Sequence, residues 1–387
     1  MNNKFIVPIL LIVLLSLMSY FNIFQNEFVW DDHVFILENA DIRSFSNIPL
    51  FFSQDVDGLY RPLRSLYYAF VYSIAKKNEF LYHFNSLFFH IIISILVFFI
   101  IHNITAKSNI SSIAALIFSV HPIHADRVTN ITAGFDLLGV FFMLLAFYFY
   151  IKFSKSNNKQ YFLSSLLLFL TAIFSSEEAI TLPLMVILYE LSFNKEKFND
   201  KTTIMKNIIN NYIYYFVIAL FYVIIRIIVV GFRGRIEEYL AGNFFSTMLT
   251  MLKVYVYYIY LLILPINLTL FREVEAVTSI LDFKALISAL VLITIIFFTL
   301  KYNKNRVLFF SVFWFFITLI PFSNLLPLQV FMAERYLYIP SIAFSLLIAY
   351  VFISTFNIKF KNLKYKKIIK IGMLIFIVAL LTFYVSS

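Results

Sequence analysis

The sequence of 387 residues has no cysteine, only 7 glycines and few charged side chains, which make up 13% of it. The absence of Cys excludes disulfide bonds, thiolate nucleophiles and Cys-ligated metals. Hydrophobic residues make up 61% of the chain, far above the roughly 45–50% of soluble domains. A chain with so little charge and so much apolar surface is expected to reside in a lipid bilayer.

Strand-like alternation is also absent, whereas long apolar runs recur along the whole chain. Runs of about 18–25 residues suffice for a tilted helix to cross the hydrocarbon core, where a helix satisfies its own backbone hydrogen bonds. The first run lacks a small-residue cleavage site, so we interpret it as a retained span. The sequence predicts an all-α polytopic membrane protein with about 10 to 11 transmembrane helices, at 5–24, 82–104, 110–121, 132–151, 161–175, 178–192, 210–230, 283–300, 307–322, 336–356 and 368–385.

The formal net charge of +10 is explained by where the basic residues lie. Most of them occur at Lys4 and in short loops, at 107, 152–159, 195–206, 301–306 and 359–370. By the positive-inside rule these loops and the N-terminus are cytoplasmic, and the charge serves orientation, so no nucleic-acid partner is expected. The outward connections are then 25–81, 121–131, 175–178, 231–282 and 323–335.

One stretch, 244–265, resists this scheme. It is apolar enough to cross the membrane, but a full crossing there would put the basic loop 301–306 outside. We predict a re-entrant or interfacial segment within the external region 231–282. A tyrosine-rich run at 255–260 favours this, because amphipathic rings prefer the membrane interface. The alternative is a true span with inverted C-terminal topology.

The first external loop, 25–81, is too long for a simple connector, and loops of that length are usually functional. It is expected to pack as interfacial helices, and it opens with the acidic pair Asp31 and Asp32. These carboxylates fit a helix N-cap followed by a first-turn acid. They also fit a general base that takes a proton from an acceptor hydroxyl. Both interpretations stay open at this point.

The second external loop, 121–131, holds His121, His124, Asp126 and Arg127 in close succession. Imidazole and carboxylate groups suit a divalent metal such as zinc or manganese. The alternative is a hydrogen-bonded turn that holds Asp126 and Arg127 in place.

Several ionisable residues lie within predicted spans, among them Asp136 near the outward end of 132–151, Glu190 in 178–192 and Arg226 in 210–230. Charged groups at membrane depth usually face a cavity or a partner.

Two more acidic or basic groups lie at outward membrane boundaries. Glu177 and Glu178 occupy a tight turn, where a solvated acid pair at a helix start is the simple alternative. Arg335 lies between Glu334 and Tyr336 at the start of the span 336–356. Its fixed fork of donors matches phosphate oxygens. An interfacial anchor or a surface ion pair with Glu334 is the alternative.

These motifs occur in an order that resembles a known family. An acidic pair follows the first span, and then come Tyr-Arg-Pro-Leu at 60–63, His-Pro-Ile-His-x-Asp at 121–126, Ser-x-Glu-x-x-x-x-Leu-Pro at 175–183 and Glu-Arg-Tyr-Leu-Tyr-Ile-Pro-Ser at 334–341. The order resembles the membrane domain of the TMTC proteins, which are transmembrane-and-tetratricopeptide-repeat O-mannosyltransferases of the GT-C glycosyltransferase superfamily. The resemblance implies a single GT-C-like membrane domain, 1–387, and no tetratricopeptide repeats are expected after its last span.

The resemblance also implies roles for individual residues. Asp31 and Asp32 would supply the catalytic base, Asp126 matches the second-loop acid of the family, and Arg335 would bind the donor phosphate. Glu177 matches the family's glutamate. Supporting roles fall to His121, His124, Glu334 and Tyr336, and a possible divalent metal (Mg, Mn or Zn) would be held by Asp126 and His124.

The chain also departs from the family pattern. Ser176 replaces the family's lysine before Glu177, and Gly134 replaces the arginine before Asp136. Arg61 and Arg127 are expected to substitute for the missing positive charge near the donor phosphate.

The implied function is inverting transfer of a hexose, with mannose favoured, from a polyprenyl-phosphate-linked donor to a protein or glycan hydroxyl. The active face would be extracytoplasmic, in the cytoplasmic membrane of a prokaryote or in the ER membrane. Three alternatives stay open: a transporter or flippase of a polar lipid, a non-catalytic membrane scaffold, and a lipid A or cell-wall transferase of the same superfamily.

The topology yields a first testable prediction. A single Cys introduced at Asn303 in this Cys-free chain is expected to be protected from a membrane-impermeant maleimide in sealed cells and labelled after permeabilisation. A Cys introduced at Asp55, in the first external loop, serves as the accessible control. Labelling of Asn303→Cys without permeabilisation would contradict the topology and favour a full span at 244–265.

Overall fold

The computed structural model describes residues 3–194, 208–232 and 236–356. Within these ranges the secondary structure is helical apart from two isolated β-bridges. The helices are α1 (Asn3–Tyr20), α2 (Ile48–Ser53), α3 (Pro62–Ala75), α4 (Glu79–Thr105), α5 (Ser108–Val120), α6 (Ala125–Thr129), α7 (Ile131–Phe135), α8 (Leu137–Ser156), α9 (Lys159–Ile173), α10 (Leu182–Phe193), α12 (Ile213–Val230), α13 (Phe244–Ile263), α14 (Phe283–Lys301), α15 (Arg306–Thr318) and α16 (Pro340–Phe356). The predicted all-α fold is confirmed.

In the part of the chain that the structure describes, six helical stretches are long and apolar enough to cross a membrane: Phe5–Gln25, Glu79–Thr105, Ile131–Ser156, Ile213–Val230, Phe244–Ile263 and Phe283–Lys301. Shorter apolar helices, α5, α9, α15 and α16, accompany them. Each predicted span from 5–24 to 336–356 coincides with a helix. The predicted span 368–385 and the basic loops 195–206 and 359–370 lie outside the described residues.

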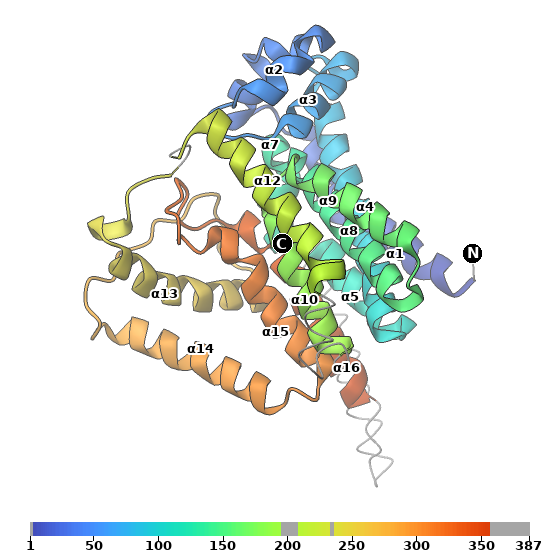
Figure 1. Cartoon of the computed structure of the whole chain (residues 1–387), viewed down its shortest axis with the longest axis vertical. Helices are drawn as coiled ribbons and strands as arrows, with labels where there is room; N and C mark the ends of the chain where they lie inside the picture. Colours follow the sequence, from blue (N-terminus) through green and yellow to red (C-terminus); the bar gives the residue numbers. More distant parts are fainter. Residues whose placement is uncertain (1–2, 195–207, 233–235, 357–387) are drawn as a thin grey trace.

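The bundle is organised around α8. Its neighbours are α4 and α9, while α5 packs against α1, α4 and α16 (Figure 1). The α8 window is largely buried, whereas α1, α12 and α14 expose most of their apolar side chains to the surroundings. In a soluble protein such exposure would be an aggregation liability, but in a bilayer it is the lipid contact. The chain is therefore a multi-pass integral membrane protein.

Close helix contacts in the bundle depend on small residues. A Cβ atom added at Gly139 of α8 would lie 2.9 Å from the backbone nitrogen of Ser176. One added at Gly134 of α7 would overlap the Ser86 hydroxyl and lie 2.7 Å from its Cβ on α4. Small residues let helices approach closely, and this packing is the main source of helix association in lipid. Gly134 thus sets the position of the segment that carries Asp136.

The first external loop folds over one end of the bundle. Its helices α2 and α3 lie at the top of Figure 1, above α7 and beside the end of α12. A small apolar core between them contains Phe35, Tyr68 and Phe135, and the rings of Tyr68 and Phe135 stack with centroids 3.9 Å apart. The loop is thus held rigidly against the outer end of α7.

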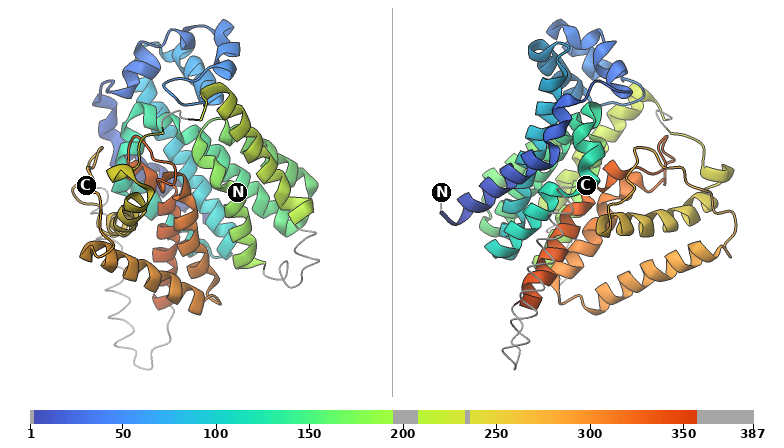
Figure 2. Two further views of the ribbon diagram at one scale, coloured as in Figure 1. Left: turned by 60° about the vertical axis from the view of Figure 1, so that its left-hand side comes forward. Right: turned by 180° about the vertical axis from the view of Figure 1, so that it is seen from behind.

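Helices α13 and α14 project to one side of the bundle, as Figure 2 shows from behind. After α13 the chain turns near His121, whose Nε2 donates to the Leu262 carbonyl 3.0 Å away. It then runs back along α13 without regular structure, so that the Val277 amide donates to Thr250 Oγ1 at 2.9 Å. Helices α13 and α14 therefore begin at the same end and run in the same direction. The re-entrant or interfacial placement of this pair in the bilayer stays a prediction.

The contact at Gly134 yields a second prediction. Gly134→Ala is expected to lower the free energy of unfolding by about 1–3 kcal/mol, the usual cost of overpacking. Unfolding can be followed by SDS titration in mixed micelles. Ser86→Gly removes the two nearest atoms, and the Ser86 Cα lies at an ordinary contact distance of 3.5 Å. The double variant should therefore lose less stability than the sum of the losses of the two single variants. Strict additivity would show that the two residues are not in contact.

Candidate functional site

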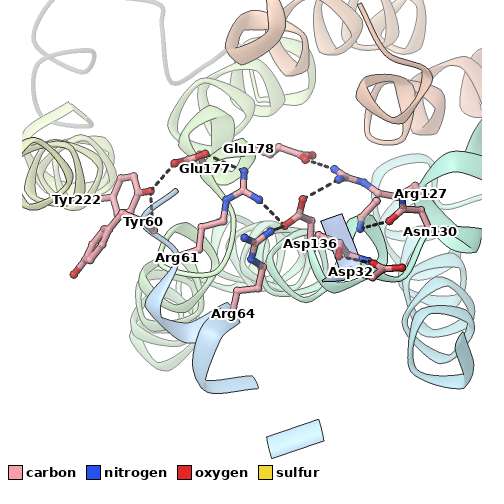
Figure 3. Close-up of polar contacts among 12 residues, drawn as sticks. Asp32, Tyr60, Arg61, Arg64, Arg127, Asn130, Asp136, Glu177, Glu178 and Tyr222 are labelled. Carbon is pink, nitrogen blue, oxygen red and sulfur yellow. Dashed lines mark hydrogen bonds and ion pairs between the residues drawn. The ribbon is translucent and has the colours of Figure 1, made fainter. Parts of the chain in front are cut away.

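A cavity of about 480 Å³ lies where the first loop, the start of α8 and the outer end of α12 meet. Its lining holds nearly all of the unusual charged residues: Asp31, Arg61, Arg64, Arg127, Asp136, Glu177, Glu178, Arg226 and Arg335. Figure 3 shows most of these side chains pointing toward one another. These charged residues, which are distant in sequence, thus line one cavity.

Asp136 is the centre of this site. Its Oδ1 accepts from Arg61 Nη1 at 2.7 Å and from Arg64 Nη1 at 2.8 Å, and its Oδ2 accepts from Arg127 Nη1 at 3.3 Å. Arg61 and Arg64 come from the start of α3, Arg127 comes from α6, and Asp136 is the N-cap of α8. One carboxylate therefore joins two loops to the bundle.

Two glutamates in the short helical turn Glu177–Thr181 complete the network. Glu178 pairs with Arg127, and Glu177 Oε2 accepts from Arg61 Nη2 at 3.0 Å. Burial opposes the charged form of Arg61, but Asp136 and Glu177 hold its pKa above the ordinary value. Arg61 is therefore a permanent cation in this cavity.

The other oxygen of Glu177 faces α12. Its Oε1 lies 3.7 Å from Arg226 Nε and accepts weakly from the Tyr222 hydroxyl at 3.5 Å. The Tyr222 hydroxyl also donates to the Tyr60 carbonyl at 3.0 Å (Figure 3). Helix α12 is thus tied to the first loop across the cavity.

The acidic pair of the first loop is divided between two environments. Asp32 is fully buried, and its carboxylate accepts from the Val29 amide, the Thr132 amide and the Thr132 hydroxyl at 2.9, 2.9 and 2.6 Å. Burial raises the pKa of Asp32, although these hydrogen bonds work in the opposite direction. Asp31 is exposed and lines the cavity. Of the two predicted bases, only Asp31 is open to a substrate.

Arg335 lines the same cavity and comes from the short helical turn Glu334–Leu337 before α16. Its Nη1 donates to Asp126 Oδ2 at 3.1 Å, and its guanidinium lies over the Tyr336 ring. Asp126 is buried behind it, and its second oxygen, Oδ1, has no hydrogen-bond partner. Asp126 therefore orients Arg335 and is not among the residues that line the cavity.

The neighbours of Arg335 have separate contacts. Glu334 is buried and accepts from the Thr269 amide at 2.7 Å and from Arg272 Nη2 at 3.3 Å. Burial raises the pKa of Glu334, and these two donors lower it in part. Tyr336 lines the cavity, and its ring stacks on Phe322 at 3.9 Å. The predicted Glu334–Arg335 surface pair is therefore not what holds Arg335.

The two histidines of the second loop lie outside the cavity lining. His121 bridges to α13 through the Leu262 carbonyl, and His124 Nε2 lies 2.8 Å from Ser341 Oγ. Burial lowers the pKa of His121 to about 4, and burial also lowers the pKa of His124 well below its ordinary value. Among residues 3–194, 208–232 and 236–356 no group of three or more His, Asp or Glu side chains could hold a metal ion. Asp126 and His124 thus have partners of their own.

Several site residues carried only weak signals in the sequence. Arg64 follows Arg61 by three residues, which places both on one face of α3. Asp136 and Arg226 were visible only as costly charges within apolar spans. Their convergence could not be read from the sequence, because they come from α3, α8 and α12.

With this geometry in hand, the fold can be compared with solved structures. It is similar to the archaeal oligosaccharyltransferase AglB from Archaeoglobus fulgidus, solved in complex with an inhibitory peptide and a dolichol-phosphate. The TM-score is 0.54 at 12% sequence identity, and the match covers 99% of this chain and 55% of that one. The architecture is thus that of a GT-C membrane protein, as the sequence predicted.

Sequence comparison identifies the relatives. Residues 61–225 match the family described as Dolichyl-phosphate-mannose-protein mannosyltransferase. The chain is 25% identical over 378 residues to the Protein O-mannosyl-transferase F38B6.6 of Caenorhabditis elegans, covering 92% of this chain and 52% of that protein. It is 29% identical over 204 residues to the Protein O-mannosyl-transferase TMTC3 of Homo sapiens, covering 49% and 22%. The resemblance to TMTC O-mannosyltransferases is confirmed, and the chain spans about half, or less, of these relatives' length.

The network around Asp136 yields a third prediction. Asp136→Asn leaves three buried or half-buried arginines with too few counter-charges, so it is expected to cost about 3–5 kcal/mol of stability, as breaking buried ion pairs does. SDS titration in mixed micelles measures the loss. Glu177→Gln is the comparison, because Glu177 is more exposed and Arg61 keeps its bond to Asp136. An equal or smaller loss for Asp136→Asn would contradict its central position.

Proposed function

We propose that this protein transfers a hexose, with mannose the favoured sugar, from a polyprenyl-phosphate-linked donor to a hydroxyl group of a protein or glycan. The observation that carries the proposal is one cavity that is lined by a solvent-exposed carboxylate, Asp31, and by a set of arginines. The relatives named as protein O-mannosyl-transferases support the sugar and the acceptor class. The active face is the extracytoplasmic one, given the predicted topology.

Asp31 is the proposed general base. It removes the proton from the acceptor hydroxyl as the oxygen attacks the anomeric carbon from the face opposite the lipid phosphate. The bond between that carbon and the phosphate oxygen breaks, and its electron pair stays on the phosphate. The product has inverted configuration, the proton is held by Asp31, and polyprenyl phosphate departs.

Arg335 is the proposed ligand of the donor phosphate, and Arg61 and Arg127 add positive charge nearby. The phosphate becomes more negative as the glycosidic bond breaks, so cations placed in advance lower the barrier. Arg335 points into the cavity because Asp126 holds one of its nitrogens from behind. Asp126 is thus a positioning residue in this proposal, although the family resemblance implied a catalytic acid.

Asp32 is also a positioning residue. Two of its three hydrogen bonds join the first loop to Thr132, at the start of α7, and the third, from the Val29 amide, lies within the loop. This contact places the neighbouring Asp31 at the cavity. In this proposal Asp32 therefore anchors the first loop, and Asp31 accepts the proton.

The two aspartates yield a fourth prediction. In a reconstituted assay with a polyprenyl-phosphate-linked hexose, Asp31→Asn is expected to lower kcat by about 10²–10⁴ at little cost in melting temperature, as loss of a general base does. Asp32→Asn is expected to lower the melting temperature and to retain more activity per folded molecule. Asp55→Asn, on the exposed part of the same loop, is the matched control.

The outcome that would overturn the base assignment is normal kcat in Asp31→Asn. Mass spectrometry of glycoproteins from cells with and without the gene tests the function itself. A protein-linked hexose that disappears with the gene supports transfer. Unchanged glycans together with altered polyprenyl-lipid distribution across the membrane would favour a flippase instead.

A further inference from the structure

Arg226 stands apart from the other arginines of the cavity. Arg61 and Arg127 each contact two carboxylates, while Arg64 and Arg335 each contact one at about 3 Å. The only ion pair of Arg226 with a described residue joins its Nε to Glu177 Oε1 at 3.7 Å, beyond hydrogen-bond distance. Among the described residues, Arg226 therefore has the weakest ionic contact of the five arginines that line the cavity.

Helical periodicity directs Arg226 inward. The buried residues of α12 are Tyr215, Ala219 and Tyr222, which form one stripe along the helix. Arg226 continues that stripe by one turn, at the point where the stripe reaches the cavity. It lies four residues before the end of α12 at Val230, hence about 6 Å from the outer end of the helix. That depth suits the phosphate of a lipid whose chain lies in the hydrocarbon core.

The wall beside Arg226 is apolar. The cavity lining includes Val223, Ile227 and Phe232, from α12 and the residues after it. It also includes Phe322, Leu326 and Leu328, from the segment before α16. The Phe232 and Leu326 side chains are strongly exposed, at 79% and 64%. In a bilayer these exposed apolar side chains contact lipid, so the cavity has a lipid-facing mouth with one arginine just inside it.

The carboxylate of Glu177 lies between Arg226 and Arg61. Its two oxygens face Arg226 and Arg61, and at 28% side-chain exposure it is the most accessible of the carboxylates that pair with arginine here. A phosphate offers more oxygens and, as a monoester, close to two negative charges. A lipid phosphate that enters through the mouth can therefore displace Glu177 from Arg226.

We infer that Arg226 captures the phosphate of a polyprenyl phosphate at the lipid-facing mouth of the cavity, and that Glu177 is the counter-anion it displaces. This inference rests on the proposed function, because it assigns to the same cavity a second residue that binds phosphate, in addition to Arg335. Arg226 comes from α12, whereas Arg335 comes from the short helical turn before α16. Arg226 selects lipids with an anionic head group over neutral polyprenols.

The experiment measures binding of a polyprenyl monophosphate to the full-length protein in nanodiscs, by native mass spectrometry, with neutral polyprenol as the comparison ligand. Arg226→Gln is expected to weaken phosphate binding by about ten- to a hundredfold, as loss of a charge-assisted hydrogen bond does. Arg226→Lys should recover part of it. Lys284→Gln, an exposed cation at the start of α14 outside the cavity, should bind as the wild type does.

Glu177→Gln separates the inference from a purely structural role. A displaced counter-anion predicts that Glu177→Gln tightens polyprenyl phosphate binding, whereas Arg226→Gln weakens it. A structural ion pair would shift binding in the same direction in both variants, and that result would overturn the inference. If Arg226→Gln fails to fold, Arg226→Lys and Glu177→Gln still provide the comparison.

The two proposals fail in different ways. Sugar transfer with an unchanged donor KM in Arg226→Gln would overturn the inference and leave the transferase intact. Arg226-dependent binding of polyprenyl phosphate without transfer from any hexose donor would support the inference and overturn the transferase. Equal binding of polyprenol and polyprenyl phosphate by the wild type would overturn the inference directly.

Discussion

The outer face of this protein depends on one carboxylate that is shared among three guanidinium groups. Asp136 lies at the first turn of α8, while Arg61 and Arg64 arrive from α3 and Arg127 from α6. Buried cations far from water need a counter-charge nearby, and removal of that charge is much more costly than its presence is stabilising. The network therefore defines where the two external loops sit more than it adds to stability. Every other feature of the cavity follows from that placement.

The shared carboxylate also explains why the cavity can be both polar and rigid. Glu177 and Glu178 bind the outer nitrogens of the same arginines, so the site holds its cations in fixed directions before any ligand arrives. Fixed charges of this kind stabilise a developing anion without reorganisation. In the acidic pair, too, a buried carboxylate with fixed hydrogen bonds positions an accessible one. The burial of Asp32 against Thr132 keeps the backbone in place, and its neighbour Asp31 stays accessible to a substrate.

Helix α12 carries both exposed apolar side chains and residues that line the cavity. One stripe of this helix packs inward through Tyr215 and Tyr222, and the remaining surface carries exposed apolar side chains. The inward stripe ends at Arg226, beside the apolar mouth of the cavity. Helices α13 and α14 form the other lipid-exposed region, and the chain between them returns along α13 to reach Glu334 through Thr269. The support of Arg335 thus includes a segment that is distant in sequence.

The sequence alone determined the helical fold and the positions of the spans, because apolar runs of membrane-spanning length permit few other structures. It also predicted Asp31, Arg61, Arg127 and Arg335 as site residues, through motif order and the resemblance to a family. All four line one cavity, and their roles stay a prediction. The pairing of Arg64 and Arg226 with carboxylates, the separation of Asp31 from Asp32, and the turn of Glu334 toward Arg272 were decided only by the tertiary structure. These outcomes depend on which helices lie side by side and which carboxylate reaches which guanidinium. Local sequence patterns contain no information on contacts between segments that are a hundred or more residues apart, such as Thr132 with Asp32 or Arg335 with Asp126.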